Sequence, residues 1–416
     1  MAAQFISGLA DNALLLVTIA RLGADGAAAW LLPLLKLVFT LAYVLLAPVV
    51  GPLSDRWPKS RVMLAANTVK ALACAALALG APPLLAFCAA GAGAAVYSPA
   101  KYGLVTELVP TRKLVAANGW IEVGTVLAIL LGTVMGGALT GPLFQSFGLP
   151  SHTVLRLAFV VVLVLYALAA LINLGIPDSG ARYPAAPPLR RQLGDFRQAN
   201  ARLWSDPLGQ ISLATTTLFW GVGATLQFVV LRWASEQLAL PLAQAAYLQG
   251  ISATGVVLGA ALAGRYVRLD QAPRVLKLGV LMGLLVPLLI CIYQPATAAV
   301  VLTAVVLLGG LFVVPMNALL QHRGSRLLSA GRSIAVQNFN ENASVLLMLA
   351  LYAGSIALGV PLHDLMLGYG LLVALLMALI WLRHRQLRRC WPAPDWHPPL
   401  LVDNNPAPLQ PHKDTA

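Results

Sequence analysis

Five charged side chains lie inside stretches of sequence that are otherwise apolar, and their types suit them to binding or proton transfer. They are Asp11, Lys70, Lys101, Glu122 and Glu341. A charge inside a long apolar helix is costly and usually faces an interior cavity, where it binds a ligand, carries a proton or pairs with an opposite charge. The sequence therefore predicts a polar site inside an apolar body and leaves these three roles open.

The first half of the chain offers two groups for such a site. Asp11 and Asn12 lie near the middle of the first predicted helix, so Asp11 is roughly 15 Å from either helix end. Lys101 follows Pro99 and precedes Tyr102, about one turn from a helix end, where a lysine can also extend toward water. We expect Asp11 and Lys101 to form a pair that a zwitterionic ligand opens. The alternative for Asp11, and the default for Lys70, is a structural pairing with a neighbouring helix.

The composition shows what kind of body must position these residues. Charged residues make up 10% of the 416-residue chain and hydrophobic residues 59%, whereas a soluble domain carries about 25% charged residues. This excludes an ordinary soluble enzyme and a disordered protein. The net charge of +13 then concerns membrane orientation and gives no indication of nucleic acid binding.

Long apolar stretches predict an all-α polytopic membrane protein with twelve transmembrane helices. A spanning helix needs about 20 mostly apolar residues, and these stretches are too long and continuous for β-barrel strands. The predicted spans are 2–22, 31–50, 62–80, 83–105, 115–139, 154–175, 209–232, 244–264, 275–293, 297–320, 334–358 and 364–383.

The basic residues alternate along this series of spans. Most of the 28 Lys and Arg residues fall in every second loop and in the tail, which predicts that both termini are cytoplasmic. The longest internal connection is one of these basic loops and divides the spans into two sets of six. We therefore predict an N-terminal half, a cytoplasmic central loop, a C-terminal half and a disordered cytoplasmic tail, at 1–175, 176–208, 209–389 and 390–416 respectively.

Two six-helix halves are the plan of major facilitator transporters, whose halves are structural repeats. The sequence repeats polar positions in a corresponding way. Lys101 follows Pro99 by two residues, and Asn317 follows Pro315 by two residues. Asn118 and Glu122 open the fifth span with the same spacing as Gln337 and Glu341 in the eleventh. These pairs are candidates for one shared polar site.

The loop between the second and third spans resembles the signature loop of that superfamily. It runs GPLSDRWPKSR, with Gly51, an acid four residues later at Asp55, and basic residues that include Arg56 and Arg61. We expect Asp55 to pair with basic residues or to cap a neighbouring helix, which would stabilise one state of a transport cycle.

Several longer blocks resemble the bacterial lysophospholipid transporters of the major facilitator superfamily over essentially the whole membrane region. They are AQF at 3–5 with DNALL at 11–15, YSPAKYG at 97–103, AANGWIE at 116–122, AILLG at 128–132, LFWGVGATL at 218–226, FVVPMNALLQHRG at 312–324 and IAVQNFNENA at 334–343.

This resemblance implies a flippase for lysophosphatidylethanolamine and lysophosphatidylglycerol in the bacterial inner membrane, working by alternating access with the head group in a polar cavity. It implies a monomer whose functional partner is an acyltransferase at the inner leaflet. It also implies that Asp11 and Lys101 meet the head group. The chain has Gln227 where the family has arginine, with Arg232 five residues later on another helix face, so the resemblance leaves head-group preference open.

Two rival functions remain. A proton-coupled exporter of drugs or small metabolites would use Glu122 or Glu341 as its proton carrier. A membrane acyltransferase would need a His-x-x-x-x-Asp pair, and none of the six histidines has an Asp five residues later. We therefore expect no enzyme. None of the four cysteines forms a CxxC pair, and we expect no metal and no cofactor.

Overall fold

The computed structural model describes residues 1–28, 31–141, 150–181, 183 and 188–390, and within these ranges it is built of helices without strands. The predicted all-α fold is therefore confirmed. The predicted tail lies outside the described residues except for Cys390, the last residue of the final helix. The α-helices are α1 (Ala2–Ala24), α2 (Leu31–Leu45), α3 (Ala47–Arg56), α4 (Lys59–Ala78), α5 (Pro83–Leu108), α6 (Leu114–Thr140), α8 (Ser151–Leu174), α9 (Leu189–Ser205), α10 (Pro207–Glu236), α11 (Leu242–Tyr266), α12 (Leu276–Leu285), α13 (Pro295–Leu327), α14 (Ala330–Ala357) and α15 (Leu362–Cys390).

Each predicted span falls on helical structure, but three of them are not single apolar helices. Among the described residues, ten segments are long and apolar enough to cross a membrane, and α2 with α3 makes an eleventh that bends by 64°. The helix α14 has the length to cross, with 28 residues, but its first half is polar. The ninth span is α12 flanked by the short helices η2 (Leu269–Val275) and η3 (Pro287–Cys291). The central loop contains α9, which the sequence reading did not predict.

Prolines and glycines mark where these helices begin and turn back. Pro83, Pro207 and Pro295 each open a helix, where the missing N–H has no helical partner to lose. Gly80 and Gly359 follow α4 and α14 with φ of 101° and 70°, a left-handed conformation that glycine adopts without strain. Both glycines precede a tight connection to the next helix.

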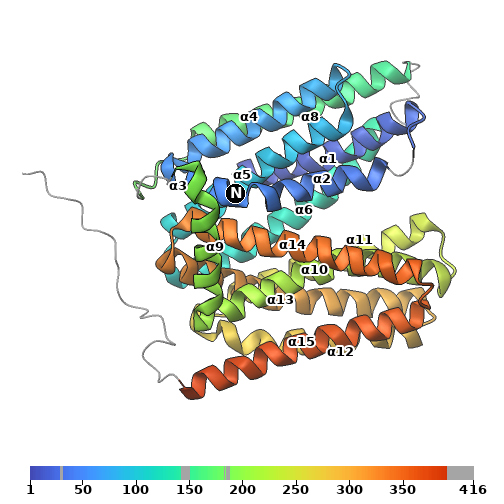
Figure 1. The fold of residues 1–416 in the computed structure, drawn as a ribbon. Helices are drawn as coiled ribbons and strands as arrows, with labels where there is room; N and C mark the ends of the chain where they lie inside the picture. Colours follow the sequence, from blue (N-terminus) through green and yellow to red (C-terminus); the bar gives the residue numbers. More distant parts are fainter. Residues whose placement is uncertain (29–30, 142–149, 182, 184–187, 391–416) are drawn as a thin grey trace, which may run out of the picture.

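The long helices form two groups that lie side by side (Figure 1). In one group α1, α4, α5, α6 and α8 pack together, and in the other α10 to α15 do. One apolar core, which includes Leu14, Leu77 and Phe159, lies within the first group. A second core, around Phe312 and Met316 of the second group, also includes Leu114, Val115 and Val123 of α6, so it continues across the contact between the two groups.

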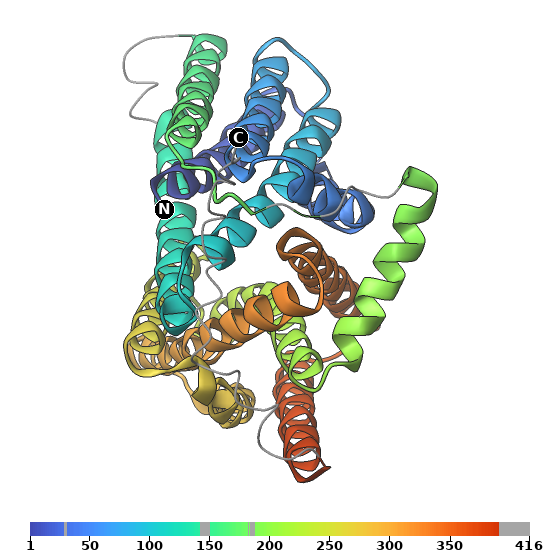
Figure 2. The ribbon, with the colours of Figure 1, turned by 90° about the vertical axis from the view of Figure 1, so that its left-hand side faces the viewer.

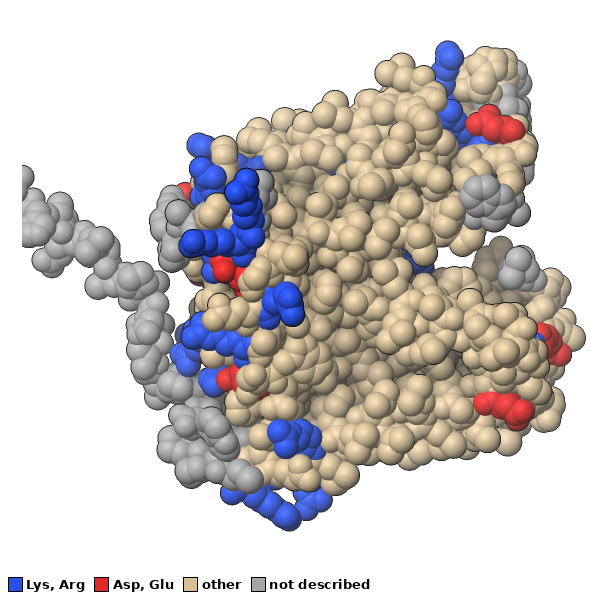
Figure 3. Space-filling view, viewed as in Figure 1, with Lys and Arg blue, Asp and Glu red and all other residues tan. Residues whose placement is uncertain are grey.

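Lys and Arg gather at one end of the molecule (Figure 3). We call this the basic end: there α3, α5 and α13 finish, α4, α6 and α14 begin, and α9 crosses from one group to the other (Figure 2). Figure 3 also shows a cleft between the two groups that opens at the opposite end.

Candidate functional site

Asp11 pairs with Lys70 rather than with Lys101. The Nζ atom of Lys70 donates to Oδ2 of Asp11 at 2.7 Å, and the hydroxyl of Tyr166 donates to Oδ1 at 2.7 Å. Lys70 is only 2% exposed and also donates to Ser7 at 3.2 Å. The expected Asp11–Lys101 pair is therefore wrong, and the structural pairing considered for Lys70 is confirmed. The network fastens α1, α4 and α8 together.

This network makes Lys70 a stability determinant of the first group of helices. Replacing Lys70 with alanine leaves Asp11 without its cation and should lower the free energy of unfolding by about 3 kcal/mol, as expected when one partner of a buried ion pair is removed. Thermal unfolding in detergent measures this loss. The double variant Asp11→Asn, Lys70→Met should recover part of it, and a double variant as unstable as Lys70→Ala would contradict the pairing.

A second polar cluster lies between the two groups and draws on both. Lys101 on α5 lies over the ring of Tyr102, with Nζ 4.0 Å from the ring centroid. It interacts electrostatically with Glu122 on α6 and with Glu341 on α14. Among the described residues Lys101 forms no ion pair within 4 Å, so this half-buried ammonium group keeps hydrogen-bonding capacity for a ligand.

The α13–α14 side of this cluster is an amide and carboxylate chain. The side-chain amide of Gln337 donates to Oδ1 of Asn317 at 2.9 Å and to Oε1 of Glu341 at 2.8 Å. All three side chains are buried, as is Glu122. One cation therefore faces two acids, an arrangement that can bind a ligand with a phosphate and an amine or carry a proton.

Two predicted site residues are not joined to this cluster by any contact seen among the described residues. The side-chain amide of Asn12 donates to the carbonyl of Gly8 in its own helix at 2.8 Å. Gln227 is exposed, and its backbone carbonyl accepts from Gln249 at 3.2 Å. Arg232, the proposed substitute for the missing arginine, pairs with Glu236 at 2.6 Å.

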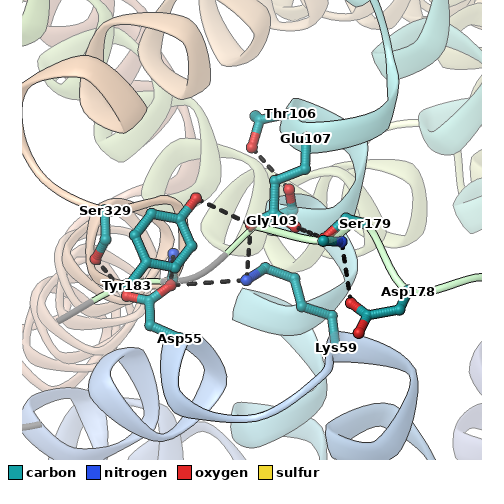
Figure 4. Close-up of polar contacts among 11 residues, drawn as sticks. Asp55, Lys59, Gly103, Thr106, Glu107, Asp178, Ser179, Tyr183 and Ser329 are labelled. Carbon is teal, nitrogen blue, oxygen red and sulfur yellow. Dashed lines mark hydrogen bonds and ion pairs between the residues drawn. The ribbon is translucent and has the colours of Figure 1, made fainter. Parts of the chain in front are cut away.

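The signature loop closes the basic end by capping a helix of the other group. The carboxylate of Asp55, at the end of α3, accepts from the backbone N–H of Gly331 at 2.9 Å and from the hydroxyl of Ser329 (Figure 4). These residues stand at the start of α14, where free N–H groups and the helix dipole favour an anion. The expected capping role of Asp55 is therefore observed.

Lys59, which was not among the predicted switch residues, is the basic partner of Asp55 in this loop. Its Nζ lies 3.7 Å from Asp55 and 2.8 Å from Glu107 at the end of α5. Glu107 also accepts from the hydroxyls of Ser179 and Tyr183, beyond the end of α8 (Figure 4). Burial and the adjacent Glu107 carboxylate raise the pKa of Tyr183 above its ordinary value, so its phenol stays a donor at neutral pH.

The predicted switch residues Arg56 and Arg61 are both exposed, unlike Lys59, which is buried. All three residues belong to the same basic stretch of sequence. Their positions in it therefore did not show that Lys59 forms ion pairs while Arg56 and Arg61 face solvent. The fourth predicted member, Gly51, is buried, and a Cβ there would lie 2.9 Å from the backbone of Arg332. Gly51 thus allows α3 to approach α14 closely.

Side-chain amides and a glycine make further contacts between the two groups of helices at the basic end. Asn118 on α6 and Gln321 on α13 exchange two side-chain hydrogen bonds of 2.9 and 2.8 Å. The amide of Asn338 on α14 donates to the hydroxyl of Ser98 on α5 at 2.9 Å. At Gly119 of α6, a Cβ would lie 2.8 Å from the carbonyl oxygen of Ala260 on α11. The two groups are therefore locked at the basic end and separated at the other.

Asp55→Ala removes the acceptor for two donors at the start of α14, the hydroxyl of Ser329 and the backbone N–H of Gly331. We expect this to weaken the closed basic end by about 2 kcal/mol, as is usual for hydrogen bonds to a charged group. Spin labels on Arg61→Cys and Arg326→Cys should then report a population with a longer interlabel distance. Arg56→Ala is the matched control because its side chain is exposed; an equal shift in both variants would contradict the role of Asp55.

The sequence model of the Major Facilitator Superfamily matches residues 1–348. The chain is 40% identical to the lysophospholipid transporter LplT of Photorhabdus laumondii subsp. laumondii over 387 residues, covering 92% of this chain and 94% of the relative. It is also 40% identical to LplT of Citrobacter koseri over 388 residues, covering 93% and 95%.

Solved structures with the same fold are more distant in sequence. An outward-facing bacterial homologue of the iron transporter ferroportin superposes with a TM-score of 0.67 at 16% identity, covering 92% of this chain and 98% of that chain. The transporter FucP, in an outward conformation, superposes with a TM-score of 0.68 at 14% identity, covering 92% and 96%. The chain, matched along most of its length, belongs to the Major Facilitator Superfamily and is a multi-pass membrane transporter.

Proposed function

We propose that this transporter moves lysophospholipids across the membrane. The observation that carries the proposal is the 40% identity, over 92% of the chain, to a named lysophospholipid transporter. The central cluster suits such a ligand because it contains one half-buried ammonium group and two buried carboxylates. The same relatives are transporters, so the membrane-enzyme alternative has no support.

The basic end is the cytoplasmic end in this proposal, in the inner membrane of a bacterium. It is supported by the gathering of Lys and Arg there (Figure 3), since positively charged residues are retained on the cytoplasmic side. The conformation described above then faces outward. A substrate from the outer leaflet would reach the cluster through the open end.

The head group is held by residues from both halves. Lys101 binds the phosphate through charge-assisted hydrogen bonds. Glu341, kept in place by Gln337, accepts from the amine of an ethanolamine head group, and Asn317 and Glu122 complete the polar wall. Lysophosphatidylethanolamine fills both charge sites, whereas lysophosphatidylglycerol would place hydroxyl groups against the amides.

The substrate is released when the basic end opens and the opposite end closes. Rocking of the halves would separate Asp55 from α14 and expose the head group to the cytoplasmic leaflet, while the acyl chain stays against apolar helix faces or in lipid. Burying a charged head without partners is expensive, which is why only the head needs the polar site. We further propose that the protein acts as a monomer and supplies an acyltransferase at the inner leaflet.

The second candidate is a proton-coupled exporter of small compounds. The two buried acids Glu122 and Glu341 near a single lysine favour it, since such acids occur in proton relays. It predicts transport of a water-soluble compound that depends on a proton gradient.

Proteoliposomes containing the purified protein and fluorescent lysophosphatidylethanolamine in one leaflet distinguish these candidates. We expect protein-dependent loss of the label from the outer leaflet, measured by a membrane-impermeant quencher. Diacyl phosphatidylethanolamine with the same label is the control ligand. No difference from protein-free liposomes would refute lysophospholipid transport, and a proton gradient applied in parallel tests coupling.

A further inference from the structure

The helix α9 has no part in the transport site, yet it is exposed along one side. It lies across the long helices at the edge of the basic end and runs from one half toward the other (Figures 1 and 2). Its neighbours include α3 of the first half and α14 of the second. An element in this position contacts both halves and leaves one of its sides exposed.

One side of α9 is fixed to the protein. Ala199 and Leu203 are buried, and the ring of Phe196 lies edge-on to Phe339 with centroids 5.2 Å apart. Asn340 on α14 donates to Oδ1 of Asn200 at 2.8 Å. These contacts hold the orientation of the helix and therefore determine which side chains face outward.

The outward side combines arginines with large apolar side chains. Leu193 is 61% exposed and Trp204 is 37% exposed. Arg190 and Arg197 are exposed as well. At about 100° per residue these four side chains lie within roughly 60° of each other around the helix axis. The indole N–H of Trp204 is satisfied by Asn340 at 3.2 Å, so the rest of its ring is left as an apolar surface.

We propose that this edge of α9, formed by Arg190, Leu193, Arg197 and Trp204, docks on anionic phospholipid head groups of the leaflet at the basic end. The arginines would contact lipid phosphates, while Leu193 and Trp204 enter the boundary between head groups and acyl chains. Interfacial helices use this combination of basic residues with Trp and Leu.

The surroundings favour a lipid surface over a protein partner. The helix lies at the basic end, against α3 of the first half and α14 of the second, where Lys and Arg gather and the apolar surface gives way to charged residues (Figure 3). The helix carries four arginines against the single acid Asp195, which complements a negatively charged leaflet. Large exposed apolar side chains next to the arginines have lipid available to cover them at that level.

The same helix supplies a matched control. Arg191 and Arg202 are also exposed, but they lie about 100–120° from Arg190 around the helix axis. Two double variants can therefore be compared, each of which removes two positive charges. One is Arg190→Gln with Arg197→Gln, on the proposed edge, and the other is Arg191→Gln with Arg202→Gln, on the opposite edge of the exposed side. Both pairs leave the buried contacts of α9 intact.

The test places a fluorophore on the proposed edge of the full chain. Ala201→Cys, which is exposed between the arginines, is labelled with bimane after Cys88, Cys291 and Cys390 are changed to serine. The protein is reconstituted into vesicles in which either phosphatidylglycerol or phosphatidylcholine carries bromine, at the same mole fraction. We expect quenching at least about two-fold stronger from the brominated anionic lipid, because each surface arginine favours anionic lipid.

The variants then assign the preference to the edge. The ratio of quenching by brominated phosphatidylglycerol to quenching by brominated phosphatidylcholine should fall to about one in the Arg190, Arg197 double variant. It should stay unchanged in the Arg191, Arg202 double variant, as expected when only the first pair meets the anionic leaflet. Equal quenching by both lipids in the unmodified helix would overturn the preference for anionic lipid. No quenching by either would show that the edge faces water or a protein partner, and an equal loss in both double variants would remove the assignment to this edge.

Discussion

Lysophospholipid transport is expected to fall by about 100-fold when Lys101 is replaced with alanine, the largest effect we predict for a single charge. The cluster at the interface between the halves contains no other ammonium group among the residues described above. A substrate phosphate would lose charge-assisted hydrogen bonds worth about 3 kcal/mol, within the range for interactions with charged groups. Initial rates in proteoliposomes measure the loss.

The control for this variant is another lysine outside the site. Lys277 is exposed and lies over the ring of Trp381, so Lys277→Ala should leave transport nearly unchanged. Lys101→Arg keeps the charge and should recover part of the activity. If Lys101→Ala transported at the normal rate, the proposed phosphate contact would be wrong.

The second large effect is steric. Gly119→Leu should abolish transport by preventing α6 and α11 from meeting at the basic end. Even a Cβ at this position would lie 2.8 Å from the carbonyl oxygen of Ala260 and 3.4 Å from Cα of Gly264. Backbone atoms cannot yield as a flexible side chain can, so the helices must separate. Spin labels on Lys113→Cys and Arg268→Cys should then report a longer distance across this contact.

Gly124 provides the matched control on the same helix. A Cβ added there has no neighbour within 4 Å, so Gly124→Leu introduces the same side chain without a clash. We expect it to retain transport and the original interlabel distance. Equal loss in both variants would mean that leucine disturbs α6 in general rather than the contact with α11.

The sequence predicted the order of the long apolar helices because each membrane-crossing helix needs its own apolar stretch. It predicted twelve spans, whereas the described residues contain ten long apolar segments and an eleventh that is bent. It did not predict the bend between α2 and α3, since the chain continues to be apolar through Leu46. Nor did it predict α9, whose buried face is short and whose sequence is strongly basic. Both features depend on packing against other helices, and the local pattern does not contain that information.

The polar site was partly predictable for a related reason. Lys101 and Asn317 follow prolines at the same spacing in two repeated halves, and Glu122 and Glu341 occupy matching places in their spans. Repeated halves bring equivalent positions toward a shared axis, and these residues do approach one another. The partner of Asp11 was mispredicted because Lys70 and Lys101 are both lysines in apolar helices, and only the packing of α1 against α4 and α8 separates them.

The basic end is closed along two seams, one between α3 and α14 and one between α6 and α11. A glycine fits closely against backbone atoms at both seams, Gly51 at the first and Gly119 at the second. Only at the first seam does a carboxylate, that of Asp55, also bond to the start of a helix. The residue four places after Gly264 is Arg268, so the second seam lacks the acid that Asp55 provides in the first. A change of charge can therefore loosen one seam while shape still holds the other. We expect the basic end to open first at the contact between α3 and α14, while the contact between α6 and α11 acts as the hinge.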